Sequence, residues 1–216
     1  MKQLIFFVVV ASFVLGAHID VKASILIFEG FKSYNYVPID QAYGDNITAL
    51  SDSVGKYLKG NGFTPHIEVS YNTVGGDPFL EAWHDNYGDL INVAYPERQN
   101  KIAEITFIAE PGYRIKINSF DMGGWKKLDR TADVLEVVDG NGSLLWRAPD
   151  MHIEGNNGHS SFFPDVDAYR LTIRFGREWN IGIDNINFDE MPDPVPAPSS
   201  LLLLLPGLAV LARKKF

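Results

Sequence analysis

The chain has 216 residues, no cysteine, and 19 Lys and Arg against 27 Asp and Glu, which gives a net charge of −8. The lack of cysteine excludes disulfides and thiolate metal sites. Between Ser24 and Pro196 the imbalance grows to 14 cationic against 26 anionic side chains. Nucleic acids and anionic membrane surfaces need clustered cations, so we expect neither as a partner of this part of the chain. Neutral glycans and divalent cations suit it better.

Residues 1–23 have the three parts of a secretory signal peptide. Lys2 is followed by an apolar run that ends at Leu15, and small residues come next. The run is well short of the ~20 residues that span a membrane, so the pattern predicts a cleaved signal peptide and export. Ala17 and Ala23 are two candidate cleavage points. Ala23 fits better, because Val21 and Ala23 would then occupy the −3 and −1 positions, which suit these residue types.

Residues 24–190 form a body of ordinary single-domain size in which apolar residues recur with period two. The clearest run is YRIKINSF at 113–120, where apolar and polar side chains alternate. Such alternation predicts a β-strand with one solvated face. A second run at 102–109 precedes it, and Glu110-Pro111-Gly112 between them is a turn signal. The two runs together predict a β-hairpin.

Short runs of the same kind recur through the rest of the body. They occupy residues 24–28, 67–71, 90–95, 134–138, 144–146, 169–175 and 181–188. Turn signals rich in glycine and asparagine separate them, such as Asp139-Gly140-Asn141-Gly142. This pattern predicts an all-β domain without a long helix, in the form of an antiparallel β-sandwich of the jelly-roll type.

The body contains no recognisable catalytic motif. It has no Gly-x-Ser-x-Gly elbow and no phosphate-cradling glycine pattern. His152 and His159 flank a turn signal, which favours a pair of solvated side chains over metal ligands. A glycosidase would need two carboxylates facing each other across a cleft, and nothing in the sequence selects such a pair. We therefore expect a protein that is not an enzyme.

Tryptophans provide the best candidates for a ligand site, and the body holds all four of the chain. Trp83 and Trp125 lie among turn-forming and charged residues, which predicts exposure, whereas Trp146 follows two leucines and is expected in the core. Aromatic faces can pack on sugar rings while amide side chains bind hydroxyl groups. The candidate carbohydrate-binding residues are therefore Trp83 and Trp125, with Asn156 and Asn157 from a turn. The alternative is that most aromatic side chains fill the sandwich.

Several short landmarks resemble known exported proteins. In chain order they are Phe28-Glu29-Gly30-Phe31, Val37-Pro38, Tyr43-Gly44-Asp45, Gly62-Phe63-Thr64-Pro65, Tyr87-Gly88-Asp89-Leu90, Glu110-Pro111-Gly112-Tyr113, residues 119–125 (SFDMGGW) and Ile183-Asp184-Asn185-Ile186. They resemble a group of PEP-CTERM proteins of unassigned function, over most of the body. The body is also similar, more loosely, to galactose-binding-like modules, whose last strand often carries Ile-Asp-x-Ile. Both resemblances imply a β-sandwich.

The galactose-binding-like resemblance also implies a structural calcium ion that joins the first strand to the last. The matching positions are Glu29 and Asp184, and Asp45 could contribute if its loop folds back. Calcium takes about six to eight oxygen ligands, which carboxylates and backbone carbonyls supply. The alternative is that these carboxylates only accept hydrogen bonds from sheet edges.

The chain ends in three parts. A proline-rich linker occupies residues 191–200, an apolar block begins at Leu201, and Arg213, Lys214 and Lys215 close the tail. The apolar block is short for a membrane span, and cations directly after such a block tend to stay in the cytoplasm. The body would then lie on the outer side of the membrane.

This tail resembles the PEP-CTERM sorting signal of Gram-negative bacteria, which the membrane protease exosortase is thought to recognise and remove. The family's Val-Pro-Glu-Pro corresponds to Val195-Pro196-Ala197-Pro198, with Ala197 in place of the usual glutamate. The resemblance implies a chain held transiently in the inner membrane through residues 201–216 and then placed at the cell surface or in the extracellular matrix.

These patterns predict an exported, non-catalytic β-sandwich protein that contacts exopolysaccharide. Two alternatives stay open. A structural or adhesive protein would show an exposed sheet edge or a large apolar patch for protein partners. A secreted glycoside-processing enzyme would show a deep groove lined with paired carboxylates.

Overall fold

The computed structural model describes residues 22–31, 35–48, 61–74, 80–97, 100–177 and 179–193. These ranges hold sixteen β-strands and one short 3-10 helix, Glu29–Phe31. The expected signal peptide, apart from its last two residues, lies outside the described residues. So do the apolar block and the whole sorting motif. No helix in the described ranges has the length and apolar character needed to cross a membrane.

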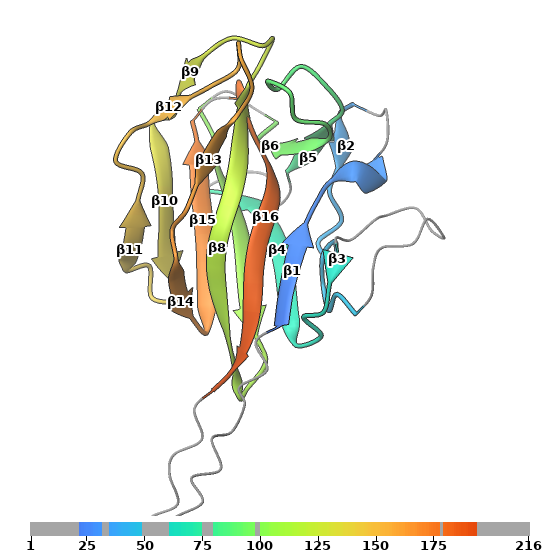
Figure 1. Ribbon diagram of the computed structural model, residues 1–216, viewed down its shortest axis with the longest axis vertical. Helices are drawn as coiled ribbons and strands as arrows, with labels where there is room; N and C mark the ends of the chain where they lie inside the picture. Colours follow the sequence, from blue (N-terminus) through green and yellow to red (C-terminus); the bar gives the residue numbers. More distant parts are fainter. Residues whose placement is uncertain are drawn as a thin grey trace, which may run out of the picture.

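The strands form two large antiparallel sheets and one small one (Figure 1). The nine-stranded sheet contains β1 (Lys22–Leu26), β2 (Val37–Pro38), β3 (Asn61–Gly62), β5 (Glu81–Trp83), β6 (Val93–Tyr95), β8 (Tyr113–Gly124), β13 (Ser160–Phe162), β14 (Val166–Ala168) and β16 (Ile181–Pro192). The five-stranded sheet has the order β11 (Leu144–Arg147), β10 (Val134–Asp139), β15 (Arg170–Gly176), β7 (Ile102–Ala109) and β4 (Ile67–Thr73). β9 (Arg130–Thr131) pairs with β12 (His152–Ile153).

The two large sheets pack face to face over one apolar core, so the predicted β-sandwich is confirmed. Ile115 and Ile117 of β8 are fully buried, as is Ile105 of β7 in the other sheet. The rings of Phe107 and Phe188 meet across the core, with their centroids 4.9 Å apart. Burying such side chains stabilises the fold by about 1.5–3 kcal/mol each.

The predicted hairpin of residues 102–120 is wrong, although both of its strands exist. β7 pairs with β15 along one edge and with β4 along the other, so it has no free edge for β8. The chain instead turns at Glu110, whose carbonyl accepts a hydrogen bond from the Tyr113 amide (3.1 Å), and enters the opposite sheet. Successive strands cross between the sheets in this way at several points, as they do in a jelly roll.

A β-bulge in β16 explains the sequence Ile183-Asp184-Asn185-Ile186. The pairing with β8 shifts register between Asp184 and Asn187, and Asn185 has a positive φ of 51°. Strict alternation would put Asn185 on the core side next to Ile183. The bulge resets the alternation, so that Ile186 and Phe188 are fully buried instead.

The first described residue, Lys22 of β1, and the end of β16 lie at the same end of the sandwich (Figure 1). β1 lies antiparallel to the last half of β16, with Lys22 paired to Glu190. β16 starts at Ile181, at the opposite end. With a rise of about 3.3 Å per residue, its twelve residues separate the two ends of the molecule by roughly 36 Å.

Candidate ligand-binding site

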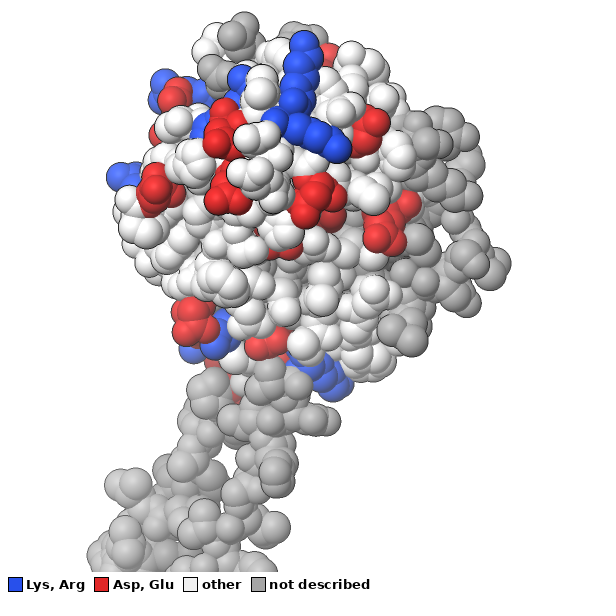
Figure 2. All heavy atoms as spheres, turned by 45° about the horizontal axis from the view of Figure 1, so that its top comes forward, with Lys and Arg blue, Asp and Glu red and all other residues white. Residues whose placement is uncertain are grey.

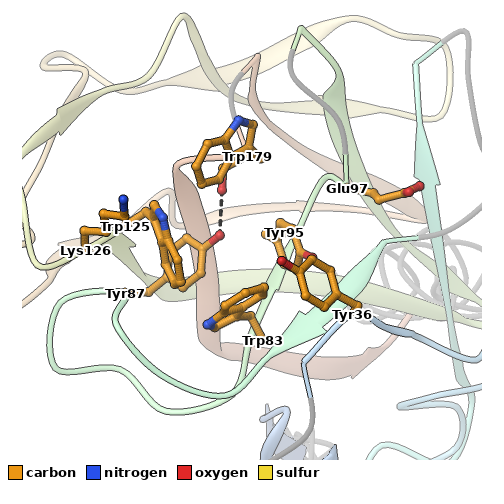
Figure 3. A pocket seen from close by; sticks show the side chains of 8 residues that line it. All are labelled: Tyr36, Trp83, Tyr87, Tyr95, Glu97, Trp125, Lys126 and Trp179. Carbon is orange, nitrogen blue, oxygen red and sulfur yellow. Dashed lines mark hydrogen bonds between the residues drawn. The ribbon is translucent and has the colours of Figure 1, made fainter.

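An open cavity of about 480 Å³ lies at the ends of several strands of the nine-stranded sheet, and Figure 3 shows the side chains that line it. We call it the aromatic pocket, because six of its lining side chains are Tyr36, Trp83, Tyr87, Tyr95, Trp125 and Trp179. Glu97 and Lys126 complete the lining. Three of the four tryptophans of the chain therefore meet in one place.

The strand order of the nine-stranded sheet brings these side chains together. Trp125 follows the last residue of β8, and Trp179 stands two residues before the start of β16, its antiparallel neighbour. Trp83 is the last residue of β5 and Tyr95 the last residue of β6, which continue the sheet beside β16. Tyr87 comes from the connection between β5 and β6. The pocket is thus built from segments that are far apart in the sequence.

Close backbone contacts hold the base of the pocket. The Trp125 amide donates to the carbonyl of Asn180 (2.8 Å), and Tyr87 forms a β-bridge with Trp125. A Cβ atom at Gly123 would lie 2.2 Å from the carbonyl oxygen of Tyr87. Glycine is therefore required at this position for the Tyr87 segment to lie against β8.

The rings of the pocket pack mainly edge to face. Trp83 lies at 83° to Trp125 with centroids 4.6 Å apart, and Tyr36 lies at 81° to Trp83 at 4.7 Å. Trp125 and Trp179 make an angle of 65° at 6.1 Å. Such pairs are favourable because the positive edge of one ring meets the negative face of the next. The three tryptophans remain only partly buried, so parts of their surfaces face the cavity.

The hydroxyl groups of the two buried tyrosines are used within the protein. Tyr87 donates to the carbonyl of Trp179 (2.6 Å), drawn as the dashed line in Figure 3. Tyr95 donates to a carboxylate oxygen of Glu81. Burial raises the pKa of both tyrosines far above the ordinary value, and burial also raises the pKa of Glu81. Both hydroxyls therefore stay protonated and keep the rings in place.

The rim carries polar groups and unusual backbone geometry. Glu97 and Lys126 put one carboxylate and one ammonium group at the edge of the aromatic surface. Two lining residues, Tyr36 and Lys126, have positive φ angles of 59° and 61°. Such conformations cost free energy in residues other than glycine and cluster at ligand sites, where the surrounding structure maintains them.

The predicted ligand-binding residues are only partly brought together. Trp83 and Trp125 touch each other in the pocket. Asn156 and Asn157 are exposed on the connection between β12 and β13 and do not line the pocket. That connection lies nearby, because His159 bonds to Asp89, two residues after Tyr87 (2.7 Å).

The three carboxylates expected to bind calcium have different surroundings. Asp184 is 4% exposed and accepts a hydrogen bond from the Phe28 amide (3.4 Å). Glu29 is exposed but close enough for its charge to act on Asp184. Asp45 accepts a hydrogen bond from the Val69 amide (2.6 Å). Within the described ranges, no group of three or more His, Asp or Glu side chains has the arrangement of a metal site.

Sequence reasoning missed most of the pocket. Tyr36, Tyr87, Tyr95 and Trp179 carry no local signal that separates them from core aromatics. One signal was usable: Trp125 follows a long strand and Trp179 precedes another. Once those strands are taken as antiparallel neighbours, their two tryptophans must meet at one end of the sheet.

Comparisons with known proteins do not identify a family. No protein-family model and no curated protein matches the chain. Among solved structures, it is similar to the enzymatically active domain of tailspike protein 4 of bacteriophage CBA120, with 18% identity and a TM-score of 0.27. The match covers 57% of this chain and 19% of that one, so this chain spans less than a fifth of the tailspike domain. A match this weak carries no argument.

Proposed function

We propose that this protein is an exported, non-catalytic carbohydrate-binding β-sandwich, and that the aromatic pocket is its binding site. One observation carries the proposal: six aromatic side chains, three of them tryptophans, line one open cavity at the end of the sandwich. Ligand pockets of about 300–1,000 Å³ are commonly lined by apolar and aromatic side chains with a few polar groups that fix orientation. The apolar face of a sugar ring and its hydroxyl groups match such a lining.

The charge distribution supports a neutral glycan over an anionic polymer. Acidic side chains are spread over the face shown in Figure 2, with basic side chains among them. The chain as a whole is acidic. This net negative charge disfavours an anionic polymer. It does not repel a neutral sugar.

Binding is favoured over hydrolysis by the lining of the pocket. Hydrolysis of a glycosidic bond generally uses two carboxyl groups on opposite sides of the bond, at most about 10 Å apart. Glu97 is the one carboxylate among the lining residues that the structure describes. A single acid at the rim can orient a hydroxyl group, but it does not provide an acid and a base together.

Intrinsic fluorescence tests the proposal directly, because most tryptophans of the chain line the pocket. The purified full chain is titrated with neutral polysaccharides, including exopolysaccharide from the producing organism. We expect a saturable change in emission, and a loss of affinity of at least about tenfold in Trp125→Ala, which is about 1.4 kcal/mol. Phe163→Ala is the matched control, since Phe163 is 69% exposed and outside the pocket. Equal affinities for parent and Trp125→Ala would refute this site.

A second candidate function rests on the edge of the five-stranded sheet. β11 lies at that edge and exposes Leu144 (49%) and Leu145 (39%). Exposed apolar edges are common pairing surfaces between chains. A structural or adhesive role would require concentration-dependent self-association that Leu144→Lys abolishes, measured by sedimentation.

A further inference from the structure

The shape of the aromatic pocket restricts which part of a glycan it can hold. A polymer bound through its internal residues runs along a surface and leaves the site in two directions, so the rings that support it face the same way. Around Trp83 the neighbouring rings are nearly perpendicular, with Tyr36 at 81° and Trp125 at 83°, whereas Tyr87 lies at 45° to Trp125. Trp83 therefore shares no plane with Tyr36 or with Trp125 along which a chain could lie.

The location of the pocket also disfavours binding of an internal stretch of a glycan. It is formed at the ends of β5 and β6, just beyond the end of β8 and just before the start of β16, and not on the open face of a sheet. Its volume of about 480 Å³ is in the lower part of the range for pockets that enclose one small ligand. That space suits one or two sugar rings.

Hydrogen bonds within the protein fix part of the pocket wall before a ligand arrives. Tyr87 and Tyr95 are held by hydrogen bonds to the Trp179 carbonyl and to Glu81. Trp125 is held through its amide to Asn180. A preformed site loses little entropy on binding, which favours recognition of a small, defined group. The opposite charges of Glu97 and Lys126 at the rim favour a residue without net charge.

We propose that the aromatic pocket takes a single terminal or branch residue of a neutral glycan, end-on, and does not bind an internal stretch of a chain. This inference rests on the proposed carbohydrate-binding function and specifies the ligand class of that site. A terminal residue has one glycosidic neighbour, so it can enter the open cavity while the rest of the glycan stays outside. An internal residue has two, and the nearly perpendicular rings around Trp83 leave no straight path for both.

The test uses the purified full chain and series of gluco-, galacto- and manno-oligosaccharides from one to six residues long. Affinities are measured by tryptophan fluorescence and calorimetry. For a series that binds, we expect dissociation constants that agree within about twofold from the disaccharide to the hexasaccharide. Limited cleavage of the parent polysaccharide should increase the number of binding sites per unit mass in proportion to the chain ends created. A steady gain of tenfold or more in affinity between two and six residues would overturn the inference.

A variant of the pocket wall adds an independent readout. Tyr36 is 66% exposed with φ of 59°, so Tyr36→Gly removes one wall and relieves backbone strain without emptying the core. We expect its affinity to fall by the same factor for every chain length, while Phe163→Ala leaves affinity unchanged. If no glycan of any series or parent polysaccharide binds, the proposed function itself fails, and that result differs from binding that grows with chain length.

Discussion

The buried carboxyl group of Asp184 accepts a hydrogen bond from the amide of Phe28, which lies between the first strand and the 3-10 helix. Burial raises its pKa to about 8, and the charges of Glu29 and Asp121 act in the same direction, although amides of Asn185 and Phe28 oppose the shift. In the unfolded chain the same group loses its proton near pH 4. The folded protein therefore keeps a proton that the unfolded protein releases.

This difference predicts a loss of stability as pH rises. Between about pH 4 and pH 8 the folded state binds one more proton than the unfolded state, so the free energy of unfolding falls by up to about 1.4 kcal/mol per pH unit. The stabilisation that comes from this bound proton is fully present below about pH 4 and is lost above about pH 8. Asp184→Asn removes it, so the variant should gain stability relative to the parent with rising pH in denaturant titrations with chelator present.

Parallel pH profiles of the two proteins would contradict this assignment. The same titrations with added calcium test the expected ion site. A divalent cation near Glu29 and Asp184 would stabilise the ionised carboxylate, flatten the profile of the parent and leave that of Asp184→Asn unchanged.

At the scale of elements, the two candidate signal-peptide cleavage points would leave different lengths of β1. The expected boundary at residue 23 falls inside this strand, which pairs with β16 from Lys22 to Leu26. A chain that begins at Ser24 lacks two of the five paired residues, whereas a chain that begins at His18 keeps them all. Each lost hydrogen bond costs about 0.5–1.5 kcal/mol.

We therefore predict that a protein starting at His18 is more stable than one starting at Ser24 by about 1–3 kcal/mol. Chemical denaturation of the two purified chains measures the difference. N-terminal sequencing of the exported protein then shows which form occurs. Equal stability of the two chains would mean that the first two residues of β1 add nothing to the sheet.

The positions of the main strands followed from the sequence because side-chain alternation is a local property. The run at 102–109 has the bounds of β7, and the runs at 113–120 and 181–188 lie within β8 and β16. The choice of partner strand did not follow, and the hairpin was wrong for that reason. Both edges of β7 are occupied by β4 and β15, and neither strand is its neighbour in the sequence.

The aromatic pocket could not be predicted in full for the same reason, because it depends on which strands are neighbours. Trp83 and Trp125 were predicted to be exposed from their polar, turn-forming neighbours; both are partly buried and line the pocket. Tyr87 and Tyr95 were not predicted, because a buried ring beneath a ligand site has the same local sequence as a core ring. Only the order of strands in the sheet distinguishes them.

At the scale of the whole molecule, the tail gives a prediction about processing. If residues 201–216 act as an exosortase-type address, the protein recovered from the cell surface or the matrix should lack them. Intact-mass measurement decides this, with a strain lacking the protease as control. A surface form that still carries the tail would refute the sorting role, and Ala197→Glu would then test whether the departure from the family pattern prevents cleavage.

The shared exit of the two chain flanks has a consequence for how the protein can be attached. β1 and β16 bring both flanks to one end of the sandwich, roughly 36 Å from the start of β16, where the aromatic pocket opens. Attachment near Lys22 or Asp193, to a membrane, a bead or an additional domain, would hold the sandwich by the end opposite to this opening. A precursor held at the membrane and a product released from it would then present the same proposed binding site, and processing would change only where that site is displayed.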